Sequence, residues 1–331
     1  MSNPYISGTG FFLPPRIVTN DELSSYMDTT DEWIQERTGI KERRYVEKGV
    51  GPSDLAIPAT EQALKAAGLT ISDIDFIIFA TSTPDFYAPG SGCVLQEKMG
   101  FNEIGALDIR VQCSGFIYGL SIAEQYIRTG NFKNILLIGA EVQSTAMNLT
   151  DEGRDTAIIF GDGSGAAIIS ATEENKGILS THMHSEGKYL KELWLEAPAS
   201  NAGHPRISRE VLDEGKQYLK MNGKEVFRHA ITRFPEVINE ALEANNLTSE
   251  NINLLIPHQA NLRITQMVQK RLGLSNDQVF SNIHKYGNTT AATIPIALAE
   301  AFNEGRIKEG DILVLAAFGA GFTWASAIMK W

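Results

Sequence analysis

Ala66-Ala-Gly-Leu-Thr-Ile-Ser-Asp-Ile-Asp-Phe-Ile-Ile78 returns, with substitutions, as Ala244-Asn-Asn-Leu-Thr-Ser-Glu-Asn-Ile-Asn-Leu-Leu-Ile256. In both stretches the pattern is typical of a helix end, a polar turn and then a buried strand. The period of this repeat is far longer than that of a solenoid. It therefore predicts a fold built from two similar halves.

A second pair of similar stretches ends at Gly130 and at Gly305, and each leads into an apolar strand. Gly305 follows Gly130 by 175 residues. The same spacing makes Asn288 the expected structural counterpart of Cys113. We therefore expect the two halves to carry different side chains at equivalent positions.

Short apolar strands alternate with amphipathic helices in both halves. The expected strands are residues 76–80, 105–109, 135–139, 157–160, 166–170 and 312–316, and the expected helices include 53–67 and 226–244. This alternation predicts an α/β architecture in which helices pack around two sheets, divided into residues 1–172 and 173–331. Ligands of such folds collect where strand ends and helix N-termini face a crevice, so we expect the function to lie between the halves.

The composition is that of a soluble globular protein: 331 residues, 43% hydrophobic, with a formal net charge of −11. That charge argues against general nucleic-acid binding, and an acidic partner would need a local basic patch. Two cysteines give no disulfide framework, and no signal-peptide pattern is present at the N-terminus, so we expect a cytoplasmic protein. Residues 312–329 carry no charge, but their glycines favour two buried strands around a turn over a membrane helix.

Cys113 lies in Leu107-Asp-Ile-Arg-Val-Gln-Cys-Ser-Gly-Phe-Ile-Tyr-Gly-Leu120, where an apolar strand gives way to a helical pattern. The thiol is thus expected at a helix N-terminus, where unpaired N–H groups and the helix dipole favour the thiolate. A lone cysteine in this position is more often a small buried hydrophobe. The residues that surround Cys113 in the fold therefore determine whether it is a nucleophile or a structural core residue.

Two further polar residues follow or flank expected strands. His258 follows a buried strand and Pro257, and Asn288 lies in a short polar run. The remaining histidines are expected to be structural: His182, His184, His204, His229 and His284. Two glycine clusters, at residues 161–165 and 317–324, are expected to form turns, and neither is specific by itself.

Six motifs, in order along the chain, resemble the β-ketoacyl-[acyl-carrier-protein] synthase III family of the thiolase superfamily. They are Thr30-Asp-Glu-Trp-Ile with Arg37-Thr-Gly-Ile40, Cys113-Ser-Gly-Phe, Gly161-Asp-Gly, His258-Gln-Ala-Asn-Leu-Arg-Ile264, Tyr286-Gly-Asn-Thr and Gly321-Phe-Thr-Trp324. The resemblance covers the chain from end to end. It implies the five-layered αβαβα thiolase fold, a homodimer, no metal and no cofactor beyond acyl-CoA as a substrate.

The implied reaction has two stages. Cys113 takes an acyl group from acyl-CoA, and a malonyl thioester on acyl carrier protein then loses CO₂ and attacks the acyl-enzyme, which initiates fatty-acid synthesis. The backbone N–H groups of Cys113 and Ala320 would form the oxyanion hole, and His258 and Asn288 would hydrogen-bond the enolate oxygen. Degradative thiolases need a second cysteine in the final glycine loop, where this chain has Phe318 to Gly321. Elongating ketosynthases have a second histidine in place of Asn288, and no candidate stands out for the catalytic glutamate of hydroxymethylglutaryl-CoA synthases.

Substrate-binding residues also carry over by motif. For CoA they are Thr29, Trp33, Arg37, Asn261 and Arg154, the last as a substitute because Glu152 occupies the family's arginine position. For docking of the carrier protein they are Arg228, Arg263, Lys270 and Arg271. Arg37 as a surface ion-pair residue, and Lys270 and Arg271 as a solvated helix face, are the competing interpretations.

Several departures from the family pattern concern the substrate. Gln112 precedes the nucleophile where a small residue is usual, Ala320 replaces a common glycine, and Ala88 stands where an aromatic residue often closes the partner subunit's acyl pocket, which Phe318 also lines. We therefore expect a roomier pocket for longer or branched acyl groups. A specialised condensing enzyme or acyltransferase of secondary metabolism, and a non-catalytic ketosynthase-like partner, remain alternatives.

Overall fold

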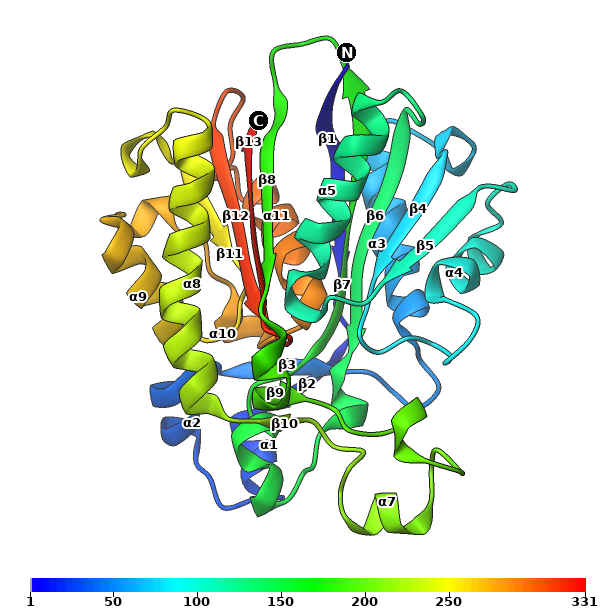
Figure 1. The fold of residues 1–331 in the computed structure, drawn as a ribbon, viewed down its shortest axis with the longest axis vertical. Helices are drawn as coiled ribbons and strands as arrows, with labels where there is room; N and C mark the ends of the chain where they lie inside the picture. Colours follow the sequence, from blue (N-terminus) through cyan, green and yellow to red (C-terminus); the bar gives the residue numbers. More distant parts are fainter. Residues whose placement is uncertain (1) are drawn as a thin grey trace.

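The computed structural model describes residues 2–331, and two sheets run side by side through the molecule (Figure 1). The first sheet has the order β1 (Asn3–Phe12), β7 (Asp162–Thr172), β6 (Asn134–Val142), β4 (Phe76–Ala80) and β5 (Gly105–Ile109). The second has the order β11 (Leu254–Pro257), β12 (Ile312–Gly319), β13 (Thr323–Lys330) and β8 (Gly177–Ser185). The expected boundary after residue 172 falls in the link between β7 and β8.

Helices occupy three layers around these sheets. Helices α5 (Gly115–Arg128) and α11 (Thr293–Asn303) lie between the sheets, α3 (Pro52–Ala67) and α4 (Ser91–Met99) cover the first sheet, and α8 (Gly223–Ala244) and α9 (Leu262–Leu272) cover the second (Figure 1). The arrangement is the five-layered αβαβα thiolase fold that the resemblance implies.

The middle layer explains why two helices are apolar on nearly every side. Phe116, Leu120, Ile294 and Leu298 are all buried, in one hydrophobic cluster with side chains from both sheets. A helix sandwiched between two sheets has no solvent face, whereas α8 and α9 keep polar residues on their outer sides. The two halves thus share a single central core.

The uncharged segment 312–329 forms two buried strands. β12 and β13 pair antiparallel, with Gly319 opposite Thr323 at the turn. Within residues 2–331, no helix is long and apolar enough to cross a membrane.

Two local predictions were wrong. Residues 157–160 do not form a strand: α6 (Arg154–Ala157) ends there, and Phe160 makes only an isolated bridge to Asn288. The glycine cluster at 161–165 is not a turn, because β7 begins at Asp162. A Cβ on Gly165 would lie 2.7 Å from backbone atoms of α11, so these glycines permit close packing of the helix on the strand.

The expected equivalence of Cys113 and Asn288 was also wrong. Each central helix is preceded by a 3₁₀ turn whose first residue has left-handed φ: Gln112 (45°) before α5 and Thr290 (52°) before α11. Cys113 therefore corresponds to Ala291, the second residue of its turn. The spacing of 175 failed because it was measured at the helix ends, and α11, with 11 residues, is three shorter than α5, with 14.

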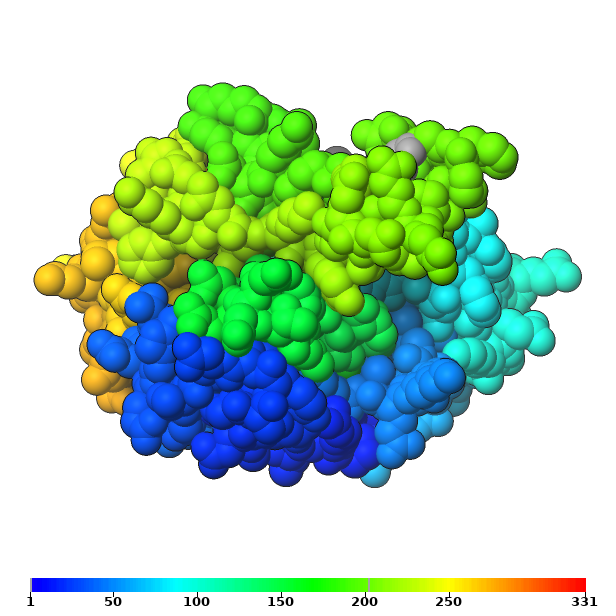
Figure 2. Space-filling view, turned by 90° about the horizontal axis from the view of Figure 1, so that it is seen from below, coloured from blue at the N-terminus to red at the C-terminus, as the bar shows by residue number. Residues whose placement is uncertain are grey.

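Smaller elements gather at one end of the molecule, seen from below in Figure 2. They are β2 (Arg16–Thr19), α1 (Asn20–Ser24), α2 (Asp31–Thr38), β3 (Glu42–Tyr45), α6, β9 (Leu193–Trp194), α7 (Arg209–Asp213), β10 (Lys220–Met221) and α10 (Ile283–Tyr286). The blue segment with α1 and α2 lies against the green segment with α6 (Figure 2). A cluster that includes Leu23, Ile34, Met147 and Ile158 joins them.

Candidate active site

Cys113 lies where β5 leads into α5. The left-handed φ of Gln112 turns the chain sharply, and the 3₁₀ turn of residues 112–114 continues directly into the helix. The sequence prediction of a thiol at a helix N-terminus is confirmed. The side chain is 5% exposed and faces a cavity.

The electrostatics of the thiol differ from the expectation. Burial, with a smaller contribution from the nearby Glu141, raises the pKa of Cys113 to about 12, although hydrogen bonds from the backbone N–H groups of Cys113 and Ala320 act in the opposite direction. The cost of desolvating the thiolate thus exceeds its stabilisation by the helix N-terminus. The resting nucleophile is therefore a protonated thiol.

The final glycine loop packs directly against this thiol. A Cβ on Gly319 would lie 2.6 Å from Cβ and 3.0 Å from Sγ of Cys113, so only glycine fits. Alanine is tolerated at position 320 because the backbone there does not need a positive φ. Among residues 2–331, the only non-glycine residues with positive φ are Gln112, Asn246 and Thr290. The backbone N–H groups of residues 113 and 320 both lie close enough to the sulfur to lower the pKa of the thiol, so both are near the place where the oxygen of a thioester on Cys113 would lie.

His258 follows β11, and its backbone N–H donates to the carbonyl of Ala316 at 2.7 Å. Its ring is buried, and Nδ1 lies 2.6 Å from Oγ1 of Thr293, the first residue of α11. Burial lowers the pKa of His258 to about 3. The imidazole is thus neutral, and Nε2 is the nitrogen left for a ligand.

Asn288 is held on both sides by backbone hydrogen bonds. Its N–H donates to the carbonyl of Ile159, and its carbonyl accepts from Gly161. Its side-chain Oδ1 accepts the N–H of Thr290 at 2.8 Å. This bond fixes the amide orientation, so the NH₂ group is available to a ligand.

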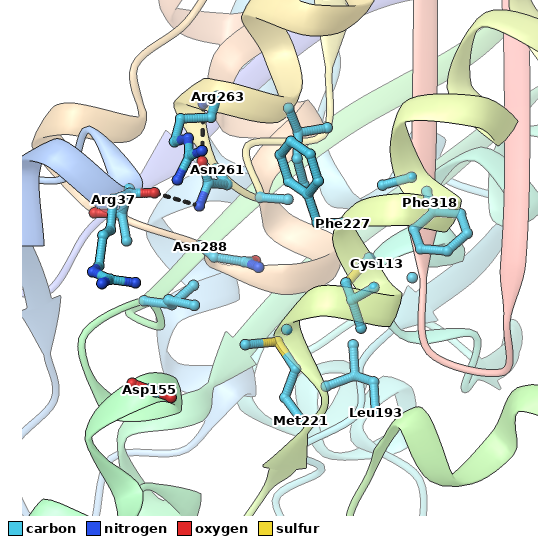
Figure 3. A pocket seen from close by; sticks show the side chains of 18 of the residues that line it. Arg37, Cys113, Asp155, Leu193, Met221, Phe227, Asn261, Arg263, Asn288 and Phe318 are labelled. Carbon is cyan, nitrogen blue, oxygen red and sulfur yellow. Dashed lines mark hydrogen bonds between the residues drawn. The ribbon is translucent and has the colours of Figure 1, made fainter.

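All three polar residues line one cavity of about 630 Å³. In Figure 3, Cys113 lies near Phe318 on one side, Arg37, Asn261 and Arg263 lie together on the other, and Asn288 lies between them. The structure thus brings together the nucleophile and the hydrogen-bonding residues that the sequence singled out. Their catalytic roles remain predictions from the resemblance.

Trp33 lies at the mouth of the cavity between two arginines. The guanidinium carbons of Arg37 and Arg154 lie 4.3 and 4.7 Å from the centre of its ring. Cation–π contacts of this kind orient the guanidinium groups beside the aromatic face. Within residues 2–331 Arg37 forms no salt bridge with a carboxylate. Arg154, which also donates to the carbonyl of Asp28, stands beside it.

The other two predicted CoA residues have different surroundings. Asn261 lines the cavity, but its amide donates to the carbonyl of Arg37 at 2.9 Å and its Oδ1 caps α9. It joins α2 to α9 and thereby shapes the mouth. Thr29 does not line the cavity, although its buried hydroxyl has no hydrogen-bond partner in the part of the chain that the structure describes.

Of the two predicted acyl-pocket residues, one lines the cavity of this chain and the other does not. Phe318 lines the cavity next to Cys113. Ala88 is exposed on the loop between β4 and α4 and does not line the cavity. The prediction for Ala88 concerns a partner subunit's pocket, so this single chain leaves it a prediction.

The basic residues proposed for docking lie on the adjacent helices α8 and α9. Arg263 lines the cavity and lies over the ring of Phe227, and Arg228 is exposed and paired with Glu225. Lys270 and Arg271 lie in the last turn of α9, where Arg271 donates to the carbonyl of Ile231. Of these four residues, only Arg263 lines the cavity.

The sequence interpretation missed several residues of the site. Lys224, Asp155, Leu193 and Met221 line the cavity, and they come from segments with no motif. Glu141, which lies close enough to raise the pKa of Cys113, was missed because it lies near the end of β6, an otherwise apolar strand. Only its contacts across the fold identify it.

Family models and individual relatives of known sequence all indicate the same protein family. Residues 107–187 match the family model of 3-oxoacyl-[acyl-carrier-protein] synthase III, and residues 242–331 match that of its C-terminal part. The chain is 47% identical to beta-ketoacyl-[acyl-carrier-protein] synthase III of Caldanaerobacter subterraneus, over 98% of this chain and 97% of the relative. It is 45% identical to the synthase III of Clostridioides difficile, over 98% of each chain.

Solved structures agree with the sequence comparison. The crystal structure of 3-oxoacyl-[acyl-carrier-protein] synthase III from Aquifex aeolicus is similar with a TM-score of 0.90 and 40% identity, covering 99% of this chain and all of the other. Full-length similarity at this identity also carries the enzyme class, an acyl-transferring condensing enzyme. The chain belongs to the β-ketoacyl-[acyl-carrier-protein] synthase III family.

Proposed function

We propose that this enzyme joins an acyl group from acyl-CoA to the two-carbon unit of malonyl-acyl carrier protein, with loss of CO₂, and so starts fatty-acid synthesis. One observation carries the proposal: Cys113, His258 and Asn288 line a single cavity whose mouth holds Trp33 between two guanidinium groups. The cavity combines a nucleophile, donors for an oxygen anion, and a place for a planar base near two positive charges.

In the first stage, the sulfur of Cys113 attacks the thioester carbon of acyl-CoA. The tetrahedral oxygen receives hydrogen bonds from the N–H groups of Cys113 and Ala320. CoA then leaves as a thiolate and takes up the proton that the Cys113 thiol has lost. The acyl group is now a thioester of Cys113, and free CoA dissociates.

In the second stage, the malonyl thioester enters the same cavity and its terminal carboxylate leaves as CO₂. The electron pair of the broken bond moves into an enolate, whose oxygen accepts hydrogen bonds from the Nε2–H of His258 and the amide of Asn288. The enolate carbon attacks the acyl thioester, and the sulfur of Cys113 leaves as a thiolate and takes a proton from solvent water. A neutral imidazole suits this stage, because it donates without adding a buried charge.

We further propose that the mouth receives both substrates from the cytoplasm. Arg37 and Arg154 would meet the phosphates of CoA while Trp33 stacks on adenine. Arg263 and Arg228 would attract the acidic carrier protein, although the enzyme itself has a net charge of −11. Lys224, at the same mouth, adds to this positive field.

We propose a homodimer, and the free edge of the first sheet supports it. β5 ends that sheet and has no strand on its outer side within residues 2–331. A second copy pairing there would cover the exposed backbone groups. Asp108 of β5 accepts the N–H groups of Ser91 and Gly92, so the loop with Ala88 ends beside this edge. Pairing would carry Ala88 toward the partner's cavity.

The small side chain at Ala88 favours a second candidate within the same chemistry, a condensing enzyme for longer or branched acyl groups. An exposed loop residue of this size leaves room where an aromatic ring would close a pocket. The acceptor would then decide between fatty-acid initiation and a specialised pathway.

Intact-protein mass spectrometry tests the first stage. The enzyme is mixed with acetyl-, isobutyryl- and octanoyl-CoA, and Cys113→Ala is the matched control, with Cys93→Ala as the control for the other cysteine. We expect an acyl adduct in the wild type and in Cys93→Ala, and none in Cys113→Ala. An unmodified wild type with every acyl-CoA would contradict the proposal and favour a non-catalytic role.

A further inference from the structure

The ring of His258 has one hydrogen-bond partner on its buried side, the hydroxyl of Thr293. The two atoms Nδ1 and Oγ1 are 2.6 Å apart. The same hydroxyl lies 3.0 Å from the carbonyl oxygen of Thr290. A hydroxyl has one proton to donate, so only one of these two contacts can be a donation from Thr293.

The alternatives put the proton of the neutral imidazole on different nitrogens. If Thr293 donates to the carbonyl of Thr290, it must accept from Nδ1–H, and Nε2 then faces the cavity as a bare lone pair. If Thr293 donates to Nδ1, the ring proton lies on Nε2 and faces the cavity as a donor. The choice decides what His258 can do to a bound thioester.

Two observations favour donation to Nδ1. A separation of 2.6 Å lies within the usual range for a hydroxyl donor, about 2.5–3.0 Å, and below that for an N–H donor, about 2.7–3.2 Å. The carbonyl of Thr290 is already satisfied, because it accepts the backbone N–H of Thr293 in the 3₁₀ turn. Donation to Nδ1 thus leaves both Nδ1 and the carbonyl of Thr290 with a partner, and directs the Nε2–H to the cavity.

We propose that Thr293 is a positioning residue whose hydroxyl donates to Nδ1 of His258 and so keeps the imidazole proton on Nε2, directed at the substrate oxygen. The inference rests on the proposed function for its catalytic consequence, but the tautomer itself does not depend on it. Thr293 touches no substrate in this account.

The turn that precedes α11 then orients both groups that donate hydrogen bonds to the enolate oxygen. The N–H of Thr290 fixes the amide of Asn288, and the hydroxyl of Thr293 fixes the tautomer of His258. Thr290 and Thr293 both belong to the segment that leads into α11. Ala291, which lies between them, packs near Gly115 at the start of α5. The left-handed φ of Thr290 is the bend that brings the two contacts together.

Nitrogen-15 NMR of histidine-labelled enzyme tests the tautomer directly. The signals of His258 are assigned by their loss in His258→Asn, and long-range couplings show which ring nitrogen carries the proton. We expect protonated Nε2 in the wild type and in Thr293→Ser, and a mixture of tautomers in Thr293→Val. Protonated Nδ1 in the wild type would overturn the inference.

Kinetics test the consequence. Decarboxylation of malonyl-CoA and acylation of Cys113 by acetyl-CoA are measured separately in the same variants. We expect Thr293→Val to slow decarboxylation between about tenfold and a hundredfold, with Thr293→Ser near the wild type and acylation changed less than threefold. Thr289→Val, which removes a buried hydroxyl from the same turn, controls for general loosening.

The outcomes separate the two proposals. Equal losses of both activities in Thr293→Val and Thr289→Val would mean that Thr293 is only structural and would overturn the inference. A wild type that carries the Nε2 proton but does not decarboxylate malonyl-CoA or malonyl-carrier protein would leave the tautomer standing and contradict the proposed function instead. Melting temperatures of all variants show whether each is folded.

Discussion

Glu141 is a fully buried carboxyl group, and replacing it with glutamine should change how stability depends on pH. Its oxygens accept hydrogen bonds from the N–H and hydroxyl of Ser82 and from the hydroxyl of Thr83, and one lies 3.5 Å from the N–H of Ala291. Burial outweighs these bonds and raises the pKa of Glu141 to about 7, from an ordinary value of 4.5. The folded protein therefore holds this proton more tightly than the unfolded chain.

The direction and size of the pH effect on the free energy of unfolding follow from this difference in pKa. Between pH 4.5 and pH 7 the unfolded chain loses the proton first, so the free energy of unfolding falls as the pH rises. A shift of this size corresponds to a loss of about 2–3 kcal/mol between pH 5 and pH 8. Glu141→Gln cannot titrate, so it should lack this part of the pH dependence, whatever constant cost its altered hydrogen bonds add.

Urea unfolding followed by circular dichroism at pH 5, 6, 7 and 8 measures the effect. The difference in unfolding free energy between Glu141→Gln and the wild type should move in favour of the variant by about 2–3 kcal/mol across this range. Glu97→Gln, at an exposed position on α4, is the control and should run parallel to the wild type. Parallel curves for Glu141→Gln as well would refute the account of a buried, protonatable carboxyl group.

The remaining predictions concern the reaction. Asn288→Ala should slow decarboxylation by about 10²–10³-fold while Cys113 is still acylated, measured by CO₂ release and by adduct mass; equal loss of both would count against a separate second stage. Trp33→Ala should raise the KM for acyl-CoA about fivefold, for a lost stacking contact of about 1 kcal/mol, with little change in kcat; an unchanged KM would remove Trp33 from the CoA site. Ala88→Phe should shift acyl-CoA preference toward acetyl-CoA, and a wild type already confined to acetyl-CoA would contradict the roomy pocket.

The sequence predicted elements and contacts that depend on local pattern. The strand and helix around Cys113, the glycine turn beside it and the duplicated layers all follow from apolar periodicity and turn residues. Residues 157–160 were wrongly expected to be a strand because their apolar side chains pack in a cluster rather than in a ladder. Short apolar runs do not separate these cases.

Contacts between distant segments could not be predicted in this way. The pairing of Thr293 with His258 joins residues 35 apart, and that of Glu141 with Ala291 joins residues 150 apart. The thiol of Cys113 was expected to be activated by the helix N-terminus, but the cost of burial depends on how completely the surrounding layers exclude water. Only the assembled fold determines that balance.

A single-turnover experiment tests the central claim most directly. Enzyme carrying the acyl group on Cys113 is mixed with malonyl-acyl carrier protein, and the adduct, the CO₂ and the carrier-bound product are followed together. We predict that one CO₂ and one β-ketoacyl-carrier protein appear for each acyl group lost from Cys113. Loss of the acyl group by hydrolysis, or its transfer to another acceptor without CO₂, would contradict it.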